Sequence, residues 1–152
     1  MKKKPTLETL LTLLAEVARE TAPDATTSPE EAYLNILKRF PEEMGSKKET
    51  FILLGLDGRR RIILAEVVSV GTLTATLVHP REVFRPAIVA SCSSIVVAHN
   101  HPSGDPTPSH EDRLLTERLV QAGRLLGINL DDHLVLGKGC FTSLRQLGLL
   151  VG

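Results

Sequence analysis

Residues 94–112 have the sequence SIVVAHNHPSGDPTPSHED, in which an apolar run leads into two histidines, a turn-rich loop and a helix start. The run 94–98 is rich in β-branched residues, which predicts a short buried strand. His99 and His101 leave the end of this strand, where side chains two residues apart point the same way. The following loop is rich in proline, glycine and aspartate, which favours turns, and Ser109 then predicts the cap of a helix. The stretch therefore predicts that a strand, a loop and a helix meet at one point.

Three side chains of this stretch form a candidate metal site. His99 and His101 supply two nitrogen ligands, and Asp112, in the first turn of the predicted helix, supplies an oxygen ligand. Three protein ligands and a water describe an open catalytic zinc site, so we predict that these residues bind Zn2+. The same ligand set also forms the facial triad of non-haem iron enzymes, which leaves iron as an alternative.

The same residues have a purely structural interpretation. Ser109 and Asp112 match a helix-capping box, in which the serine caps the helix and the acid reaches back to it. His99 and His101 would then be partly buried histidines held by their neighbours. We favour the metal, because two histidines at i and i+2 with an acid opening the next helix seldom coincide by accident.

These residues also carry a family resemblance. The JAMM (MPN+) metallopeptidase signature, H-x-H-P followed by S-x-x-D, is similar to residues 99–102 together with Ser109 and Asp112. Within that superfamily, three segments resemble the bacterial RadC family: VHPREVF at 78–84, AHNHPSGD at 98–105 and DHLVLG at 132–137. The resemblance runs from about residue 28 to the C-terminus.

The predicted fold class is α/β. Apolar runs joined by a turn, a helix that crosses over and a strand that feeds the site predict a mixed sheet covered by helices. The resemblance implies the same architecture, a layered α-β-α mixed sheet of the JAMM/MPN type, which is related to the cytidine-deaminase fold. The sequence lacks the H-x-E and P-C-x-x-C motifs of zinc deaminases and the H-E-x-x-H motif of thermolysin-like proteases.

The family pattern also contains an upstream glutamate that binds the water and serves as general acid and base. Glu49 is the residue we match to it, because residues 49–54 resemble the opening of the family's first strand. Glu66, within the apolar run 62–68, is the rival. Ser109 would donate a hydrogen bond to the oxyanion, although capping competes for the same hydroxyl. Glu49 and Ser109 are therefore the predicted catalytic residues.

The predicted function is zinc-dependent, water-mediated hydrolysis of an amide or isopeptide bond in a peptide or protein, as in a RadC-like JAMM metallopeptidase. The alternative is a catalytically silent, metal-stabilised interaction module associated with DNA repair or recombination. The general base Glu49 and an open fourth coordination position distinguish the two.

The composition is that of a soluble globular domain. The 152 residues are 42% hydrophobic and 24% charged, and the formal net charge is zero. That balance does not indicate a surface for DNA, and the sequence lacks the N-terminal helix-hairpin-helix region that longer RadC proteins carry. Cys92 and Cys140 form neither a disulfide framework nor a C-x-x-C pair. No signal peptide or membrane span is predicted, so we expect a cytoplasmic protein without a membrane partner.

Residues 1–27 are predicted to form an N-terminal amphipathic helix and a linker, followed by the RadC-like metal-binding domain at 28–152. The helix is indicated by apolar residues at helical spacing: Leu7, Leu10, Leu11, Leu14, Val17 and Ala18. We expect this stripe to pack on the domain, and self-association into a homodimer is the alternative. Residues 21–27 are the predicted linker.

Local signals predict the elements before the metal loop. A capped helix begins after Ser28, with Glu31 closing a capping box. Two apolar runs joined by a two-residue Asp57-Gly58 turn predict a hairpin. A third strand is predicted over residues 72–78, where threonine alternates with apolar residues.

Two helices are predicted on either side of the metal loop. In the first, which opens at residues 79–82, Pro86 should kink or shorten the helix and Ile88 should face inward. The second is the longest and ends at Gly127, with Leu125 and Leu126 facing inward.

The C-terminal segment is predicted to contain a strand at 128–136, a short strand at 140–142 and a helical turn at 143–147. The resemblance implies that Asp132 or His133, both on the first of these strands, orients a metal ligand. A histidine satisfied by its neighbours at a strand start is the structural alternative.

Overall fold

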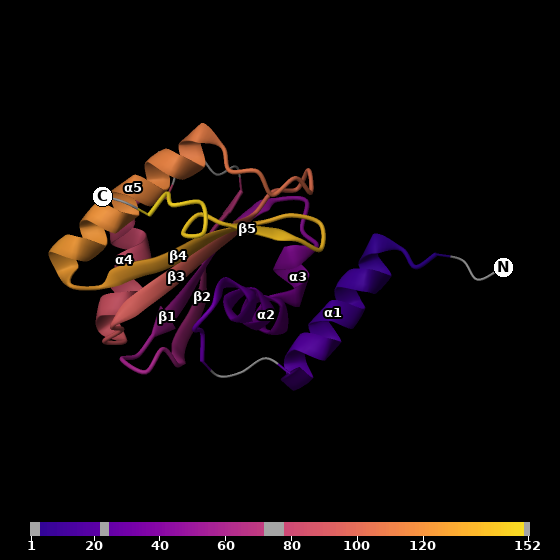
Figure 1. Ribbon diagram of the computed structural model, residues 1–152, viewed down its shortest axis with the longest axis horizontal. Helices are drawn as coiled ribbons and strands as arrows, with labels where there is room; N and C mark the ends of the chain where they lie inside the picture. Colours follow the sequence, from indigo (N-terminus) through magenta and orange to yellow (C-terminus); the bar gives the residue numbers. More distant parts are fainter. Residues whose placement is uncertain (1–3, 22–24, 72–77, 151–152) are drawn as a thin grey trace.

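The computed structural model describes residues 4–21, 25–71 and 78–150 of the chain. Within these residues, five strands form one mixed sheet with helices on both faces, which confirms the predicted α/β class (Figure 1). In chain order the elements are α1 (Leu7–Thr21), α2 (Pro29–Arg39), α3 (Pro41–Met44), β1 (Glu49–Leu56), β2 (Ile62–Gly71), α4 (Pro80–Val89), β3 (Ser94–Asn100), α5 (His110–Leu126), β4 (Asn129–Leu136) and β5 (Phe141–Ser143).

The strand order across the sheet is β2-β1-β3-β4-β5. β3 and β4 run parallel, whereas the other neighbouring pairs are antiparallel. Parallel neighbours need a crossover connection, and α5 provides it. The loop between β3 and α5 therefore lies at the edge of the sheet where β3 and β4 both end, and this loop carries the predicted metal site.

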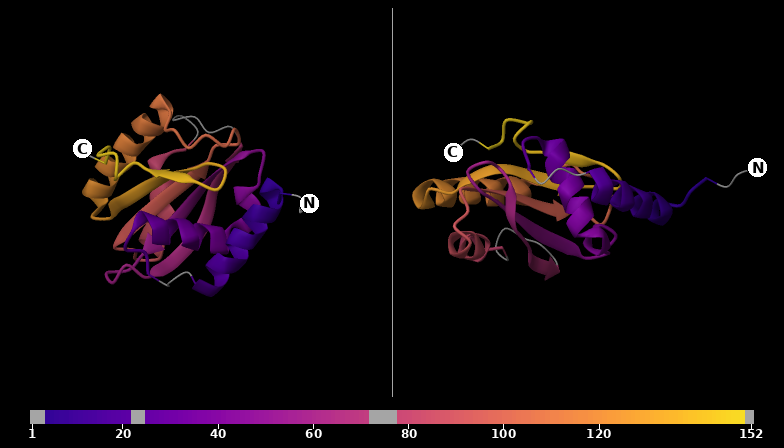
Figure 2. Two further views of the ribbon diagram at one scale, coloured as in Figure 1. Left: turned by 45° about the vertical axis from the view of Figure 1, so that its right-hand side comes forward. Right: turned by 90° about the horizontal axis from the view of Figure 1, so that it is seen from below.

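The side chains of the central strands alternate between two cores, one on each face of the sheet. On one face, α2 and α3 cover Ile52, Leu54, Val96 and Ala98. On the other face, α4 and α5 cover Phe51, Leu53, Ile95 and Val97. This is the predicted α-β-α layering, and Figure 2 shows the sheet between the two groups of helices. Because His99 follows Ile95 and Val97 at the same two-residue spacing, its side chain lies on the α5 face.

The predicted N-terminal helix is present as α1, which lies beside α2 and α3 and far from α4 and α5 (Figures 1 and 2). Most of its apolar stripe is exposed, with Leu10 at 43% and Val17 at 54%, while Leu11 is half-buried. The expectation that the whole stripe packs on the domain is therefore wrong, and self-association stays a prediction. Neither α1 nor another helix in the described part of the chain is long and apolar enough to cross a bilayer.

Part of the predicted linker is attached to the domain. Residues 22–24 lie outside the described residues, but Ala25 forms a β-bridge with Arg61, and the Thr26 N–H donates to the Arg60 carbonyl at 2.9 Å. Because these backbone groups are bonded to the hairpin, residues 25 and 26 are not a linker. The domain boundary at residue 28 stays a prediction.

The start of α2 differs in one contact from the predicted capping box. The Ser28 hydroxyl oxygen accepts the Glu31 N–H at 3.2 Å, as expected. The Glu31 carboxylate, however, accepts the N–H and the hydroxyl of Thr27, both at 2.8 Å. The acid thus binds the residue before the cap, which also holds residue 27 against the domain.

The predicted hairpin is present as β1 and β2, but its turn is longer than two residues. The Asp57 N–H donates to the Arg61 carbonyl, and the Asp57 carboxylate accepts the N–H groups of Arg59 and Arg61, each at 2.9 Å. Arg60 takes the positive φ of 63° that closes the turn. The aspartate side chain organises this wider turn by satisfying two backbone donors. Residues 72–77 of the predicted third strand lie outside the described part of the chain, and Val78, its last residue, is buried but lies in no strand.

Pro86 does not shorten α4, which continues to Val89. A proline inside a helix removes one donor, and this helix is retained because Val83, Phe84 and Ala87 bury its inner face. Ile88 is 51% exposed, so the prediction that it faces inward is wrong.

The end of α5 is also only partly as predicted. Gly127 ends the helix in the left-handed conformation, with φ of 72°. Leu125 and Leu126 are 90% and 48% exposed, so neither faces the core as predicted. Gly123 is buried in the last turns instead, beside Phe84 and Ile128, because its lack of a side chain lets the helix approach closely.

Candidate metal centre

The predicted metal ligands come from two elements that meet at one edge of the sheet. His99 is the second-last residue of the buried strand β3, and His101 directly follows that strand. Asp112 lies in the first turn of α5. Their ligand atoms all lie within 4.8 Å of one another. The structure thus brings together the three side chains that the sequence singles out.

The contacts within this group are short. His99 Nε2 lies 3.1 Å from His101 Nε2 and 3.0 Å from Asp112 Oδ1. His101 Nε2 lies 3.1 Å from Asp112 Oδ2. The side chain of His99 is 2% exposed, whereas those of His101 and Asp112 are 16% and 14% exposed. Water therefore reaches the group from the side of His101 and Asp112.

Asp112 closes the capping box and faces the histidines at the same time. Its Oδ2 accepts the Ser109 N–H at 2.8 Å, and the Ser109 hydroxyl oxygen accepts the Asp112 N–H at 3.1 Å. The structural and the metal-binding interpretations of the sequence therefore coexist. Burial acts to raise the pKa of Asp112, but the hydrogen bond and charge of His99 and the hydrogen bonds of Ser109 outweigh it and hold this pKa well below its usual range. Asp112 is thus an ionised carboxylate.

The ring of His101 is oriented by its own loop. Its Nδ1 lies 2.8 Å from the Asp105 carbonyl oxygen, and a carbonyl only accepts, so Nδ1 carries a hydrogen. Gly104, at φ of 86°, closes this loop by donating its N–H to the His101 carbonyl at 2.9 Å. The Lys138 N–H donates to the Gly104 carbonyl at 3.0 Å, which ties the loop to the end of β4. The loop thus directs the other ring nitrogen of His101, Nε2, toward Asp112.

The ring of His99 is contacted by side chains of the core. Its Nδ1 lies 2.8 Å from Nε2 of His133, a fully buried residue of β4. The Nδ1 of His133 lies 2.7 Å from the Thr116 hydroxyl, which in turn lies 2.7 Å from the Asp112 carbonyl oxygen. Burial, and then the neighbouring His99, hold the pKa of His133 well below its usual value. Sequence reasoning did not identify Thr116, although its position one turn after Asp112 on the same helix face was a usable signal.

Of the pair Asp132 and His133, only the histidine contacts a candidate ligand. The Asp132 carboxylate accepts the Ser143 hydroxyl at 2.6 Å and the N–H groups of His133 and Arg145 at 2.7 and 3.1 Å. Burial raises the pKa of Asp132, although these hydrogen bonds oppose the shift. Asp132 thus holds the C-terminal segment against β4.

Strand pairing distinguishes the two candidate general bases. In the antiparallel pair of β1 and β3, Phe51 lies opposite His99, and the two rings stack with centroids 6.2 Å apart. Glu49, two residues before Phe51, therefore lies on the same face and toward the end of the sheet where His101 follows β3. Glu66 lies on β2 opposite Leu53, farther from that end.

Glu66 belongs to a different surface. It lines a cavity between β2 and α4, together with Arg81 and Arg85. Glu49 is half-buried at the start of β1. The register thus places Glu49, and not Glu66, at the end of the sheet where the metal ligands lie.

Ser109 is compatible with both roles that the sequence allows. Its hydroxyl oxygen accepts the Asp112 N–H through a lone pair. The hydroxyl hydrogen is not used in that contact and remains able to donate. Capping and oxyanion stabilisation therefore do not exclude each other at this residue.

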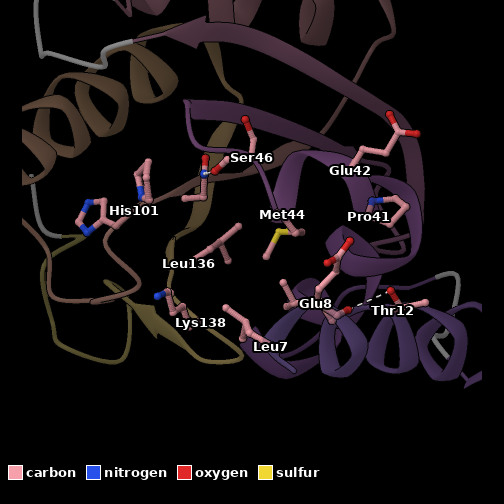
Figure 3. Close-up of a pocket in the computed structure, with 15 residues that line it drawn as sticks. Leu7, Glu8, Thr12, Pro41, Glu42, Met44, Ser46, His101, Leu136 and Lys138 are labelled. Atoms are coloured by element: carbon pink, nitrogen blue, oxygen red, sulfur yellow. Dashed lines mark hydrogen bonds between the residues drawn. The ribbon is translucent and has the colours of Figure 1, made fainter. Parts of the chain in front are cut away.

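A cavity of about 610 Å³ opens next to His101, between α1, α3 and the ends of β3 and β4. Figure 3 shows that its walls are partly apolar and carry charges of both signs, from Leu7, Glu8, Met44, Leu136 and Lys138 among others. Of the three candidate ligands only His101 lines this cavity, and its ring points away from the other lining side chains in Figure 3.

The sequence is similar to a described family and to several curated proteins. The RadC-like JAB domain matches residues 26–149. A UPF0758 protein of Symbiobacterium thermophilum is 59% identical over 104 residues, which cover 68% of this chain and 44% of that protein. UPF0758 proteins of Methanosarcina acetivorans and Caldanaerobacter subterraneus are 48% and 50% identical over 123 residues, or 81% and 80% of this chain and 52% and 51% of theirs. The chain spans about half the length of these curated relatives.

Proposed function

The chain belongs to the RadC-like JAB domain family, and from that premise we propose that it is a zinc-dependent hydrolase of the JAMM metallopeptidase type. The proposed reaction is hydrolysis of an amide or isopeptide bond by water. The proposed ligands are His99, His101 and Asp112, and the proposed substrate is a peptide or protein.

One observation carries the proposal: atoms of the kinds that bind zinc converge on each other. His101 Nε2 lies 3.1 Å from a carboxylate oxygen of Asp112, and His99 Nε2 lies 3.1 Å from the same nitrogen. Acceptors at such distances repel unless a proton or a cation lies between them. Two imidazole nitrogens and one carboxylate at a solvent-accessible edge match the donor set of catalytic zinc.

The chain's own residues supply the remaining chemistry in this proposal. His99, His101 and Asp112 would hold the zinc, which would act as a Lewis acid that lowers the pKa of a bound water toward neutrality. Glu49 takes the proton of that water and delivers it to the leaving amine. Ser109 donates its hydroxyl hydrogen to the developing oxyanion.

The test combines metal analysis with a pair of matched variants. Protein purified without added zinc is analysed for metal and assayed on a panel of peptide and isopeptide substrates. Glu49→Gln should keep its zinc and lose about 10²–10⁴-fold in turnover, the range for loss of a general base. Glu66→Gln, the same change on β2, should leave turnover unchanged.

The outcomes separate the candidate functions. Zinc together with Glu49-dependent cleavage supports the hydrolase. Stoichiometric zinc without cleavage of any substrate in the panel would favour the silent, metal-stabilised interaction module. A protein that binds no divalent metal would contradict both.

A further inference from the structure

We infer that Thr116 and His133 are positioning residues that determine which ring nitrogen of His99 carries the hydrogen, and so keep His99 Nε2 free to bind metal. The inference rests on the proposed metal site. It assigns a role to two buried side chains that touch neither the water nor the substrate in the mechanism above.

The direction of the first hydrogen bond follows from the main chain. The Thr116 hydroxyl lies 2.7 Å from the Asp112 carbonyl oxygen, which only accepts. The single hydroxyl hydrogen of Thr116 is therefore donated to Asp112. The contact of 2.7 Å between this hydroxyl and His133 Nδ1 must then use a hydrogen on His133.

The direction of the second hydrogen bond follows from burial. His133 is 0% exposed, and its ring lies between Thr116, His99 and the edge of Phe51. A charged imidazole without an anionic partner is costly in such a place, so His133 is neutral. With its hydrogen on Nδ1, its Nε2 is an acceptor, and the 2.8 Å contact uses the hydrogen on His99 Nδ1.

The consequence reaches the metal centre. With the hydrogen of Nδ1 donated to His133, the nitrogen through which His99 can bind a cation is Nε2, which lies 3.0 Å from Asp112 Oδ1. The Thr116 hydroxyl thus connects two proposed ligands: it binds the main chain of Asp112 and, through His133, selects the hydrogen position of His99. Without that hydroxyl, the hydrogen of His133 can move to Nε2, which places the hydrogen of His99 on its metal-binding nitrogen.

The experiment compares three variants of the full chain. Thr116→Val removes the hydroxyl with little change in volume, and Thr116→Ser keeps it. Thr26→Val is the matched control, because Thr26 is 2% exposed and its hydroxyl has no partner among the described residues. Zinc affinity is measured by competition with a chromophoric chelator, and ¹⁵N NMR of metal-free protein reports whether His99 Nδ1 carries a hydrogen.

We expect His99 Nδ1 to carry a hydrogen in metal-free wild-type protein, with or without a second hydrogen on Nε2 toward Asp112. Thr116→Val should remove the Nδ1 hydrogen from part of the molecules and bind zinc about 10–100-fold more weakly, the range for loss of a partner behind a metal ligand. Thr116→Ser and Thr26→Val should behave as wild type in both measurements.

Three results would overturn the inference: a His99 Nδ1 without hydrogen in wild-type protein, wild-type zinc affinity in Thr116→Val, or equal losses in Thr116→Val and Thr116→Ser. The first needs no variant, so it decides the case even if Thr116→Val does not fold. Because it is made without metal, it also separates failure of this inference from failure of the proposed zinc site.

Discussion

The two imidazoles of the candidate centre are oriented by opposite means. His99 is 2% exposed, and its ring contacts the core side chain of His133 on β4, which in turn contacts Thr116 on α5. His101 is 16% exposed, and a main-chain carbonyl of its own loop holds it, four residues away. The centre thus has a buried half that depends on tertiary packing and an exposed half that depends on local loop conformation. Variants of the buried and exposed halves should therefore differ in unfolding free energy even where they lose zinc affinity to the same extent.

The largest expected effect is common to both halves. Zinc at about 1,000 times its Kd stabilises a folded protein by about 4 kcal/mol. His99→Ala and His101→Ala should each lose most of this gain, measured as the difference in unfolding free energy between zinc and EDTA. If zinc stabilises His101→Ala as much as wild type, His101 is not a ligand of the proposed centre.

The exposed half should contain the catalytic hydroxyl. Ser109→Ala should lower turnover by about 10²–10³-fold, the loss expected for a well-aimed oxyanion donor. Ser28→Ala is the control, since Ser28 caps α2 in the same way as Ser109 caps α5. Both variants should lose about 1 kcal/mol of stability in urea unfolding. If turnover per folded Ser109→Ala molecule equals that of wild type, the serine acts as a cap only.

In metal-free protein, only the buried half should contribute to stability. His99→Ala leaves the buried Nε2 of His133 without its partner, which should cost about 1–3 kcal/mol. His101→Ala, at a partly exposed loop position, should stay within about 0.5 kcal/mol of wild type. Urea unfolding in EDTA measures both. Equal losses of unfolding free energy in the two variants would show that His99 and His101 do not differ in their contribution to the stability of the metal-free protein.

The smallest expected effect concerns the loop that orients His101. Gly104 has φ of 86°, and a Cβ there would collide with the side chain of Lys138. Gly104→Ala should cost about 1–2 kcal/mol through backbone strain and should also weaken zinc binding. Gly139→Ala is the control, because Gly139 also has a positive φ, of 66°, but no atom within 4 Å of the added Cβ and no contact with His101 in the described structure. If the two variants weaken zinc binding equally, the loop does not orient His101.

The ligand set of the exposed half was predictable because its determinants are local. The chain reaches Asp112, in the first turn of α5, soon after His101, which follows the end of β3. The alternation of strand side chains and the capping of α5 are therefore enough to bring His101 and Asp112 together. The same local rules failed where burial depends on distant segments. Ile88 and Leu125 have helical spacing suited to the core, yet both are exposed because no other element covers them in the described structure.

The preference for Glu49 over Glu66 rested on the family resemblance of residues 49–54 and not on local pattern. Both are acids at or within apolar strands, so strand periodicity alone does not separate them. The pairing of Phe51 with His99 places the first on the side of the metal ligands, while Glu66 lies against α4. Strand register is a long-range property, so only the assembled sheet distinguishes them.

The sequence by itself determined the α/β class, the family and the three candidate ligands, because periodicity, capping and short motifs act over a few residues. Only the tertiary structure decided what lies behind those ligands. His99 meets His133 across the parallel pair of β3 and β4, and His133 meets Thr116 on the crossover helix, contacts that span 34 and 17 residues of sequence. Hydrogen bonds between such distant residues depend on how the sheet and α5 pack, and no local pattern encodes that packing.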